Sequence, residues 1–296
     1  MADIQISDEA LKGIQDKVVL ITGGSSGIGR ATVELCLHLG AKVIIGDVNP
    51  PRPEFPESEN LRFFKVDVSE WESVRSLFVQ AQACFNRIDH VFVNAGVGPT
   101  TDFLDETLDE SGQLAAPNMR TMNVNLTGVI YTLRLAVHFF RKEKDTAAAK
   151  SIVLSASASS FQNFSAADYG TAKHGVLGVL RGVGGQIDSN IRVNAVAPSW
   201  TATGMVPTEA IRSMGVAVQE PEAVARSIVL LFADQQRYGE VIYSWDGKFR
   251  EINKAKGGLL DSALSVLGDL VSEDEVMNKL KAAAEAARAA AQAGQS

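Results

Sequence analysis

Residues 17–29 read KVVLITGGSSGIG, and this stretch decides the fold. Its first five residues form a short, apolar and largely β-branched run, which predicts a buried strand. The glycine-rich turn that follows leads directly into a helical pattern that extends to Leu39. Strand, glycine-rich turn and helix in this order are typical of a dinucleotide-binding unit. A plain glycine turn is the alternative interpretation.

The glycines of this turn have separate roles in a dinucleotide-binding unit. Gly23 permits a tight turn, Gly27 lets the backbone approach a pyrophosphate, and Gly29 lets the helix pack closely on the strand. The pyrophosphate would lie at the helix N-terminus, where free N–H groups and the helix dipole favour an anion. We therefore expect the cofactor to contact Gly23, Ser25, Ser26, Gly27, Ile28 and Gly29.

The next apolar run, residues 42–46, ends at Asp47. A dinucleotide fold places an acidic residue here to bind the ribose hydroxyls of the adenosine. A carboxylate at this point would repel a 2′-phosphate, and Ser26 stands where a basic residue would otherwise bind one. The pattern predicts NAD rather than NADP as the cofactor. An aspartate that merely caps its own turn is the alternative.

Strand and helix patterns alternate along the rest of the chain, and the strands are nearly continuously apolar. This is typical of a parallel sheet covered on both faces. We predict an α/β fold with one Rossmann-type, doubly wound parallel sheet of about seven strands and helices on both faces. The expected strands are residues 17–21, 42–46, 61–66, 90–93, 151–154, 191–196 and 240–243, and the clearest helices are residues 71–85, 122–141 and 222–232.

Segments without this alternation mark the boundaries of the domain. Residues 3–16 read as a polar lead-in with a short helix at 8–14, and the four prolines of residues 49–60 predict a loop. Residues 97–118 read as a long acidic surface loop. We assign residues 1–258 to the Rossmann domain and residues 259–296 to a helical C-terminal extension. That extension either packs on a partner subunit or is a fraying tail.

Tyr169 and Lys173 lie one helical turn apart, which places a phenol beside an ammonium on one helix face. A nearby cation lowers the pKa of a phenol, and such a tyrosine can exchange a proton with an alcohol. The serines that follow residues 151–154 would hold the substrate oxygen beside the phenol. A surface tyrosine stacked on a lysine stem is the plainer alternative for the pair taken alone.

Composition excludes several other classes of function. The net charge of −7 argues against a nucleic-acid surface or a basic membrane-binding face. No apolar run reaches membrane-spanning length, and the first residues lack a signal-peptide pattern. The two cysteines suit a reducing compartment, so we expect a cytoplasmic location. The four histidines are scattered, so we expect no metal.

Four motifs in order resemble the short-chain dehydrogenase/reductase family. They are the glycine-rich turn at 22–29, Asn94-Ala95-Gly96, a serine-bearing fifth strand end, and the Tyr169/Lys173 pair. The likeness covers about residues 15–250. The wording around residues 155–160 and 197–204 is similar to a filamentous-fungal subgroup, and more distantly to 15-hydroxyprostaglandin dehydrogenase.

The resemblance implies a role for each matching residue. Tyr169 would be the acid/base, Lys173 would lower its pKa and hold the nicotinamide ribose, and Asn125 would hold a water in the proton relay. In the family the catalytic serine precedes the tyrosine by thirteen residues, a position that is Ala156 here. Alignment on the strand gives Ser157 instead, with Ser155 as the fallback. Further cofactor contacts would come from Asp67, Val68, Asn94, Ala95, Gly96, Pro198, Thr201 and Thr203.

The family also implies an activity and an assembly state. We expect an NAD-dependent oxidoreductase that interconverts a secondary alcohol and a ketone, and that works as a homodimer or homotetramer. Val97, Phe161, Phe164 and Trp200 would line the pocket entrance. They suggest a bulky apolar substrate, such as a terpenoid or polyketide alcohol of secondary metabolism. A redox-neutral isomerase, dehydratase or cyclase, and a nucleotide-sensing binding protein, are the alternatives.

Overall fold

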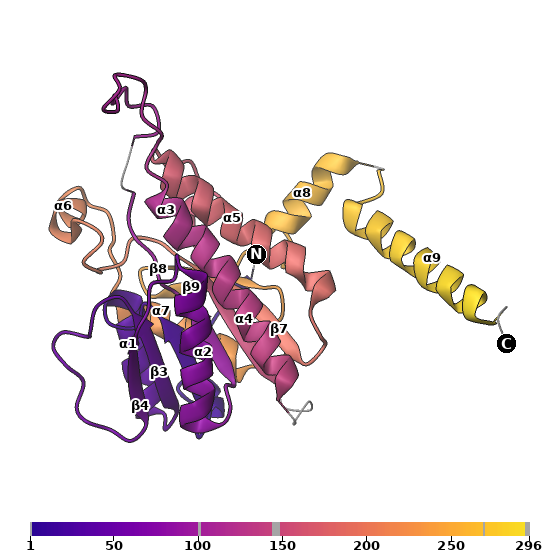
Figure 1. The fold of residues 1–296 in the computed structure, drawn as a ribbon, viewed down its shortest axis with the longest axis horizontal. Coiled ribbons are helices and arrows are strands. Elements are labelled where there is room, and N and C mark those ends of the chain that lie inside the picture. Colours follow the sequence, from indigo (N-terminus) through magenta and orange to yellow (C-terminus); the bar gives the residue numbers. More distant parts are fainter. Residues whose placement is uncertain (1, 100–101, 144–148, 269, 294–296) are drawn as a thin grey trace.

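A parallel sheet forms the centre of the molecule, as predicted (Figure 1). The computed structural model describes residues 2–99, 102–143, 149–268 and 270–293. Seven strands pair in parallel in the order β4-β3-β2-β5-β6-β7-β8, which is the doubly wound order. They are β2 (Val18–Thr22), β3 (Lys42–Asp47), β4 (Leu61–Lys65), β5 (His90–Val93), β6 (Lys150–Ser155), β7 (Ile191–Pro198) and β8 (Val241–Trp245).

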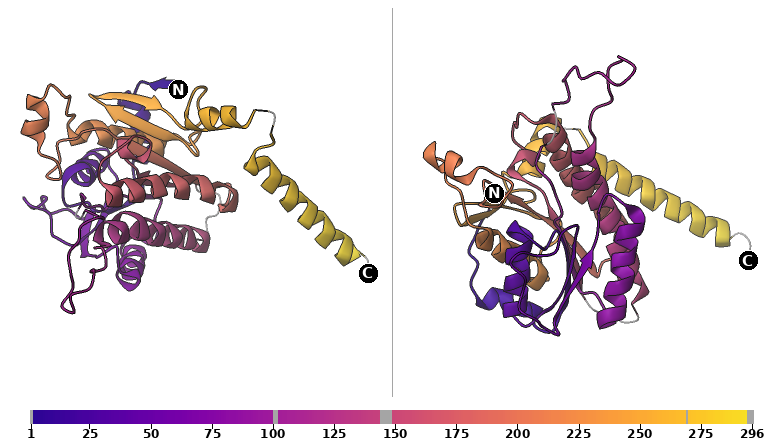
Figure 2. Two further views of the ribbon diagram at one scale, coloured as in Figure 1. Left: turned by 90° about the horizontal axis from the view of Figure 1, so that it is seen from above. Right: turned by 60° about the vertical axis from the view of Figure 1, so that its left-hand side comes forward.

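Helices cover both faces of this sheet (Figure 2). One face packs against α2 (Trp71–Phe85), α4 (Gly128–Lys142) and α5 (Ala167–Val183), and the other against α1 (Gly27–His38), α7 (Pro221–Ala233) and the short helix η1 (Glu9–Ile14). Successive side chains of β2 point to opposite faces, so that Leu20 joins the first core and Ile21 the second. Burial on both sides explains why the strand sequences are continuously apolar.

Two antiparallel strands at one edge of the sheet were missed by the sequence analysis. β9 (Lys248–Glu251) returns along β8, and β1 (Ala2–Ile4) pairs with β9. The lead-in therefore contains a strand, contrary to the prediction, although η1 lies where a short helix was expected. A two-residue turn, Asp246-Gly247, joins β8 to β9, and both residues have positive φ. Asp-Gly is a favoured hairpin turn, so the sequence did carry the signal for β9.

The remaining elements are short or lie outside the sheet core. The predicted helix at 122–141 is interrupted, because α3 (Arg120–Met122) continues into a π-helical turn, η2 (Asn123–Thr127), before α4 begins. The other short helices are η3 (Ala158–Ser160), η4 (Gly184–Gln186) and α6 (Thr208–Ser213). The proline-rich segment 49–60 contains neither helix nor strand, as expected.

The C-terminal extension consists of α8 (Leu259–Leu267) and α9 (Glu273–Ala293). Leu259 packs on the core that α4 and α5 share, whereas α9 projects away from the body in every view (Figures 1 and 2). Ser272 accepts a hydrogen bond from the Glu275 backbone N–H and so caps the start of α9. Among the described residues, no helix is long and apolar enough to cross a bilayer.

Candidate active site

The glycine-rich turn has the geometry of a cradle for a bound group. Gly23 has φ +69° and Gly27 has φ +51°, a region that favours glycine. A Cβ atom at Gly29 would lie 2.0 Å from the carbonyl oxygen of Gly23, so only glycine lets α1 approach the end of β2 so closely. Without side chains at these positions, the turn, the end of β5 and the N-terminus of α1 lie close together, with the backbone of the turn in front of the helix. The residues therefore fit the pyrophosphate of a dinucleotide.

Asp47 lies beside this turn, at the end of β3. One carboxylate oxygen accepts a hydrogen bond from the Ser25 backbone N–H at 3.0 Å, and the other accepts one from the Asn49 N–H at 3.1 Å. The Ser25 hydroxyl in turn donates to the Asn49 carbonyl at 2.7 Å. Asp47 therefore stands where the ribose was expected and also caps its own turn, so the two interpretations are compatible. Ser26 is the exposed N-cap residue of α1.

Asn94 fastens the end of β5 to the glycine-rich turn. Its side-chain amide donates to the carbonyl oxygens of Thr22 and Gly23, both at 3.0 Å. The hydroxyl of Thr22 accepts the backbone N–H groups of Asn94, at 3.0 Å, and Ala95, at 3.3 Å. The sequence analysis did not assign a role to Thr22, which is fully buried and joins two predicted motifs. A buried threonine at a strand end was the available signal.

Asn125 is fully buried in the π-helical turn η2 and holds the next part of the same segment. Its side-chain nitrogen donates to the Val97 carbonyl and its side-chain oxygen accepts the Val97 N–H, both at 2.8 Å. This paired contact fixes the loop after β5. π-Helical turns occur frequently at functional sites. The loop backbone thus occupies both polar atoms of the Asn125 side chain. The role of Asn125 in holding a water stays a prediction.

Two predicted cofactor contacts, Asp67 and Val68, follow β4. Asp67 is exposed, and its carboxylate accepts hydrogen bonds from the N–H and the hydroxyl of Ser69. Val68 is buried and packs against Gly128 at the start of α4, where a Cβ would come within 2.8 Å of the valine. Both residues therefore lie at the carboxyl edge of the sheet, as predicted.

Ser157 and Tyr169 meet at the carboxyl end of β6. Ser157 is the N-cap residue of η3, and Tyr169 lies in the first turn of α5. Burial raises the pKa of the Tyr169 phenol, and a hydrogen bond with Ser157 acts in the opposite direction. The serine against the phenol is thus Ser157, the first choice of the sequence analysis. Ser155 contributes its backbone carbonyl to Lys173.

Ser159 extends this pair into a chain of hydroxyls. Its hydroxyl donates to the Ser157 oxygen at 2.8 Å, and its backbone N–H donates to the same oxygen at 3.2 Å. With two donors directed at its oxygen, the Ser157 proton is free to point to Tyr169. Ser159 is one of the serines that follow residues 151–154, but the sequence analysis did not predict its contact with Ser157. The run of serines itself was the signal.

Lys173 is buried, and its ammonium donates to the Ser155 carbonyl at 2.7 Å. Burial lowers the pKa of Lys173 to about 8. Its nitrogen lies 5.7 Å from the centre of the Tyr169 ring. The expected lowering of the tyrosine pKa by Lys173 is not seen in this structure. Burial of the phenol dominates, and the lysine head is held by the Ser155 carbonyl instead.

The segment after β7 closes the other side of the cradle. Pro198 ends β7, and the buried Thr201 donates its hydroxyl to the Ser199 carbonyl at 2.8 Å. The side chain of Thr203 lies against Gly27, where an added Cβ would come within 2.9 Å of it. Pro198, Thr201 and Thr203 thus follow one another from the end of β7 toward the glycine-rich turn, and their contacts with a cofactor stay a prediction.

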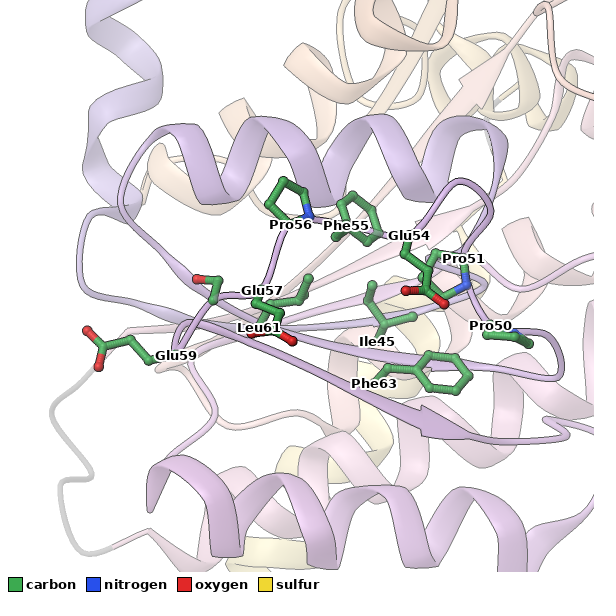
Figure 3. Close-up of a pocket in the computed structure, with 11 residues that line it drawn as sticks. Ile45, Pro50, Pro51, Glu54, Phe55, Pro56, Glu57, Glu59, Leu61 and Phe63 are labelled. Carbon is green, nitrogen blue, oxygen red and sulfur yellow. The ribbon is translucent and has the colours of Figure 1, made fainter.

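A cavity of about 650 Å³ lies beside the outer edge of the sheet (Figure 3). Ile45 of β3 and Phe63 of β4 lie opposite Phe55 and Pro56 of the proline-rich segment. Proline disfavours a helix, so this crossover leaves part of the sheet without a helical cover. The residues that line the cavity include none of the predicted catalytic residues, and the cavity is a separate feature of the fold.

Within the described part of the chain, no three His, Cys, Asp or Glu side chains gather as metal ligands do.

A family model described as short chain dehydrogenase matches residues 17–212. The short-chain dehydrogenase/reductase ascJ of Acremonium egyptiacum is 44% identical over 284 residues, which cover 95% of this chain and 96% of that protein. The chain belongs to the short-chain dehydrogenase family.

A further relative and a solved structure are also similar to this short-chain dehydrogenase. The 5′-hydroxyaverantin dehydrogenase of Dothistroma septosporum is 32% identical over 239 residues, covering 73% of this chain and 78% of that protein. The 3-ketoacyl-(acyl-carrier-protein) reductase of Brucella melitensis, solved as a complex with NADH, has a TM-score of 0.67 and 23% identity. It covers 78% of this chain and 97% of its own, and shows the same fold. The family binds nicotinamide cofactors, and its fungal members confirm the predicted resemblance to a filamentous-fungal subgroup.

Proposed function

We propose that this chain is an NAD-dependent oxidoreductase that interconverts a secondary alcohol and a ketone on a bulky apolar molecule of secondary metabolism. The observation that carries the proposal is the meeting of Ser157, Tyr169 and Lys173 at the carboxyl edge of the sheet, next to a glycine-rich cradle. The names of fungal relatives support it, since one of them is a dehydrogenase of a hydroxylated compound. Both cysteines are free thiols, which supports a cytoplasmic location.

The protein side of the reaction follows from these three residues. The bound nicotinamide supplies or accepts the hydride. Ser157 donates a hydrogen bond to the substrate oxygen and Tyr169 exchanges a proton with it. Because burial raises the pKa of Tyr169, the phenol is protonated at neutral pH in the free protein. That form is the acid needed to protonate the oxygen of a ketone as it is reduced.

The choice of NAD over NADP rests on charge near the ribose. Asp47 places a carboxylate beside the glycine-rich turn, which disfavours a 2′-phosphate. The nearby basic residue, Arg30, is engaged by other partners. Its guanidinium donates to Glu34 and to the Pro53 carbonyl, and it stacks on the Phe55 ring. Both observations support NAD.

The substrate class rests on the side chains around the phenol. The Phe164 ring lies 5.7 Å from the Tyr169 ring, and 39% of Phe164 is exposed. Trp200 is 38% exposed on the segment that closes the cradle. An exposed aromatic ring beside the phenol, with a second exposed ring on the segment after β7, is suited to an apolar ring system. They support a bulky apolar alcohol or ketone as the substrate.

The test uses NADH, NADPH and a panel of bulky apolar ketones, with nucleotide binding measured by calorimetry and turnover by the loss of NADH absorbance. We expect tighter binding of NADH than NADPH and turnover of at least one ketone. Tyr169→Phe should bind NADH normally and lose a factor of about 10²–10⁴ in kcat. Tyr131→Phe is the matched control, since Tyr131 packs edge-on against Trp71 and is not one of the predicted site residues. Unchanged turnover in Tyr169→Phe would contradict the proposal.

The same experiment separates the cofactor from the chemistry. Asp47→Asn should narrow the gap between NADH and NADPH affinity and leave the fold intact. If NADH binds but no alcohol or ketone is ever turned over, a redox-neutral reaction of this site becomes the better explanation. If neither nucleotide binds, the cofactor assignment of the glycine-rich turn is wrong.

A further inference from the structure

An apolar stripe runs along α9 from Val276 to Ala287, and its side chains are exposed. Val276, Leu280, Ala283 and Ala287 follow one another at intervals of four, three and four residues, which is the heptad spacing of a coiled-coil seam. Val276 is 40% and Leu280 59% exposed, and the two alanines are exposed as well. Asn278, Lys281 and Glu285 form the opposite face. An amphipathic helix with an open apolar face is built to meet another surface.

The C-terminal extension is an addition to the catalytic fold, and the sequence of at least one relative aligns with part of it. The Brucella melitensis reductase is matched over 97% of its own length but reaches only 78% of this chain. The alignment with ascJ leaves out 5% of this chain, about 15 residues, whereas residues 259–296 number 38. That alignment therefore extends into the C-terminal extension. A segment that is absent from the fold neighbour but present in a full-length relative suggests a separate role.

We propose that α9 pairs with α9 of a second copy of this chain, in the antiparallel direction. In one antiparallel register, Leu280 packs on Ala283 of the partner subunit and Val276 on Ala287 of the partner subunit. Each large side chain then faces a small one, and the register is the same from either copy. Alanine at the last two of the four seam positions, Ala283 and Ala287, lets the two helices approach closely. A self-complementary seam of this kind is what a twofold contact requires.

The charges of α9 determine the direction. Its first turn, Glu273, Asp274 and Glu275, carries a charge of −3, whereas residues 276–293 carry three basic residues and one acidic residue, a net charge of +2. A parallel pair would place the two acidic turns side by side. An antiparallel pair places each acidic turn beside the basic part of the other helix and opposes the two helix dipoles. The antiparallel arrangement is therefore favoured.

Charge also argues against a membrane as the occupant of the stripe. Residues 259–296 contain six acidic and three basic residues, a net charge of −3. Helices that lie on membranes are usually rich in Lys and Arg on the polar face, which attracts anionic lipids. The acidic first turn of α9 would be repelled by such a surface. A second copy of α9 would cover the apolar stripe and would place opposite charges beside each other.

Cysteine cross-linking in the full-length protein tests the arrangement, whatever other contacts the subunits make. The background variant is Cys84→Ser, because Cys84 is exposed and Cys36 is buried. Ala283→Cys, Val276→Cys and Glu285→Cys are each treated with a short bismaleimide. With a rise of 1.5 Å per residue, two copies of residue 283 are offset by about 4.5 Å along an antiparallel pair, and two copies of residue 276 by about 16 Å.

We expect Ala283→Cys to give several-fold more cross-linked dimer than Val276→Cys, on denaturing gels and by mass. Glu285→Cys, on the outer face, should give little. No dimer from Ala283→Cys would overturn the pairing, as expected if α9 docks on a subunit body or on lipid. Equal yields from Ala283→Cys and Val276→Cys would indicate a parallel pair and would overturn the antiparallel arrangement.

Discussion

Replacement of Lys173 by methionine should change the pH dependence of stability: relative to wild type, the variant should be more stable at neutral pH than it is at high pH. Lys173 is buried, and burial lowers its pKa from 10.5 to about 8. At pH 7 the folded protein must hold a charged ammonium away from water. Methionine has a similar length and no charge, so Lys173→Met removes this cost and keeps most of the packing.

The magnitude follows from the difference between folded and unfolded protonation. A fall in pKa from 10.5 to about 8 corresponds to about 3 kcal/mol against the charged form. Between pH 8 and pH 10.5 the unfolded chain keeps the proton that the folded protein has lost, so wild type gains stability as the pH rises. From pH 7 to pH 10 the free energy of unfolding of wild type, relative to that of Lys173→Met, should rise by about 2.5 kcal/mol. Loss of the hydrogen bond to the Ser155 carbonyl lowers the stability of Lys173→Met by the same amount at pH 7 and at pH 10. It therefore does not affect this change with pH.

Denaturant unfolding at pH 7, 8, 9 and 10 measures this difference, and pH effects on all other groups cancel between the two proteins. Lys65→Met, which replaces an exposed lysine, is the control and should show a constant difference from wild type. If the difference between wild type and Lys173→Met stays constant from pH 7 to pH 10, the ammonium is not buried at a cost and the reasoning fails.

Two further substitutions test the cradle and the hydroxyl chain. Gly29→Ala should destabilise the protein by at least about 2 kcal/mol in thermal or denaturant unfolding, because the Cβ would lie 2.0 Å from the Gly23 carbonyl. Gly178→Ala on α5, where a Cβ meets nothing within 4 Å, should instead stabilise the protein by up to about 1 kcal/mol. Equal changes in stability for the two variants would contradict the packing argument. Ser159→Ala should lower kcat about five-fold, the equivalent of one hydrogen bond of about 1 kcal/mol, with the KM for NADH unchanged. Unaltered kcat would show that Ser157 does not need the Ser159 donor.

The parallel core of the fold could be predicted because its signals are local. A strand that is buried on both faces must be apolar at every position, so β2 and β3 can be read directly from the sequence. Gly23 and Gly29 could be assigned because no other residue satisfies their backbone and packing demands. Asp47 could be placed because the ends of parallel strands meet at one edge.

The missed elements depend on contacts that are distant in sequence. β1 is three residues long and becomes a strand because β9 is available to pair with it at the edge. Thr22 gained its role from Asn94, 72 residues later, which no local pattern shows. The break between α3 and α4 arises at Asn125, whose side chain bonds the Val97 backbone on another segment. In each case a contact with a distant segment determines a local structure that the local sequence pattern does not.

The protonation of Tyr169 and Lys173 shows why their spacing alone gave the wrong sign for the tyrosine pKa. Burial favours the neutral form of both groups, so it raises the pKa of the phenol and lowers the pKa of the ammonium. The lysine therefore loses its proton at a lower pH than the tyrosine does. With the Lys173 head held at the Ser155 carbonyl, the free protein is arranged to donate a proton from Tyr169 rather than to accept one. A positive charge brought close to the phenol would lower the pKa of Tyr169 and favour proton acceptance.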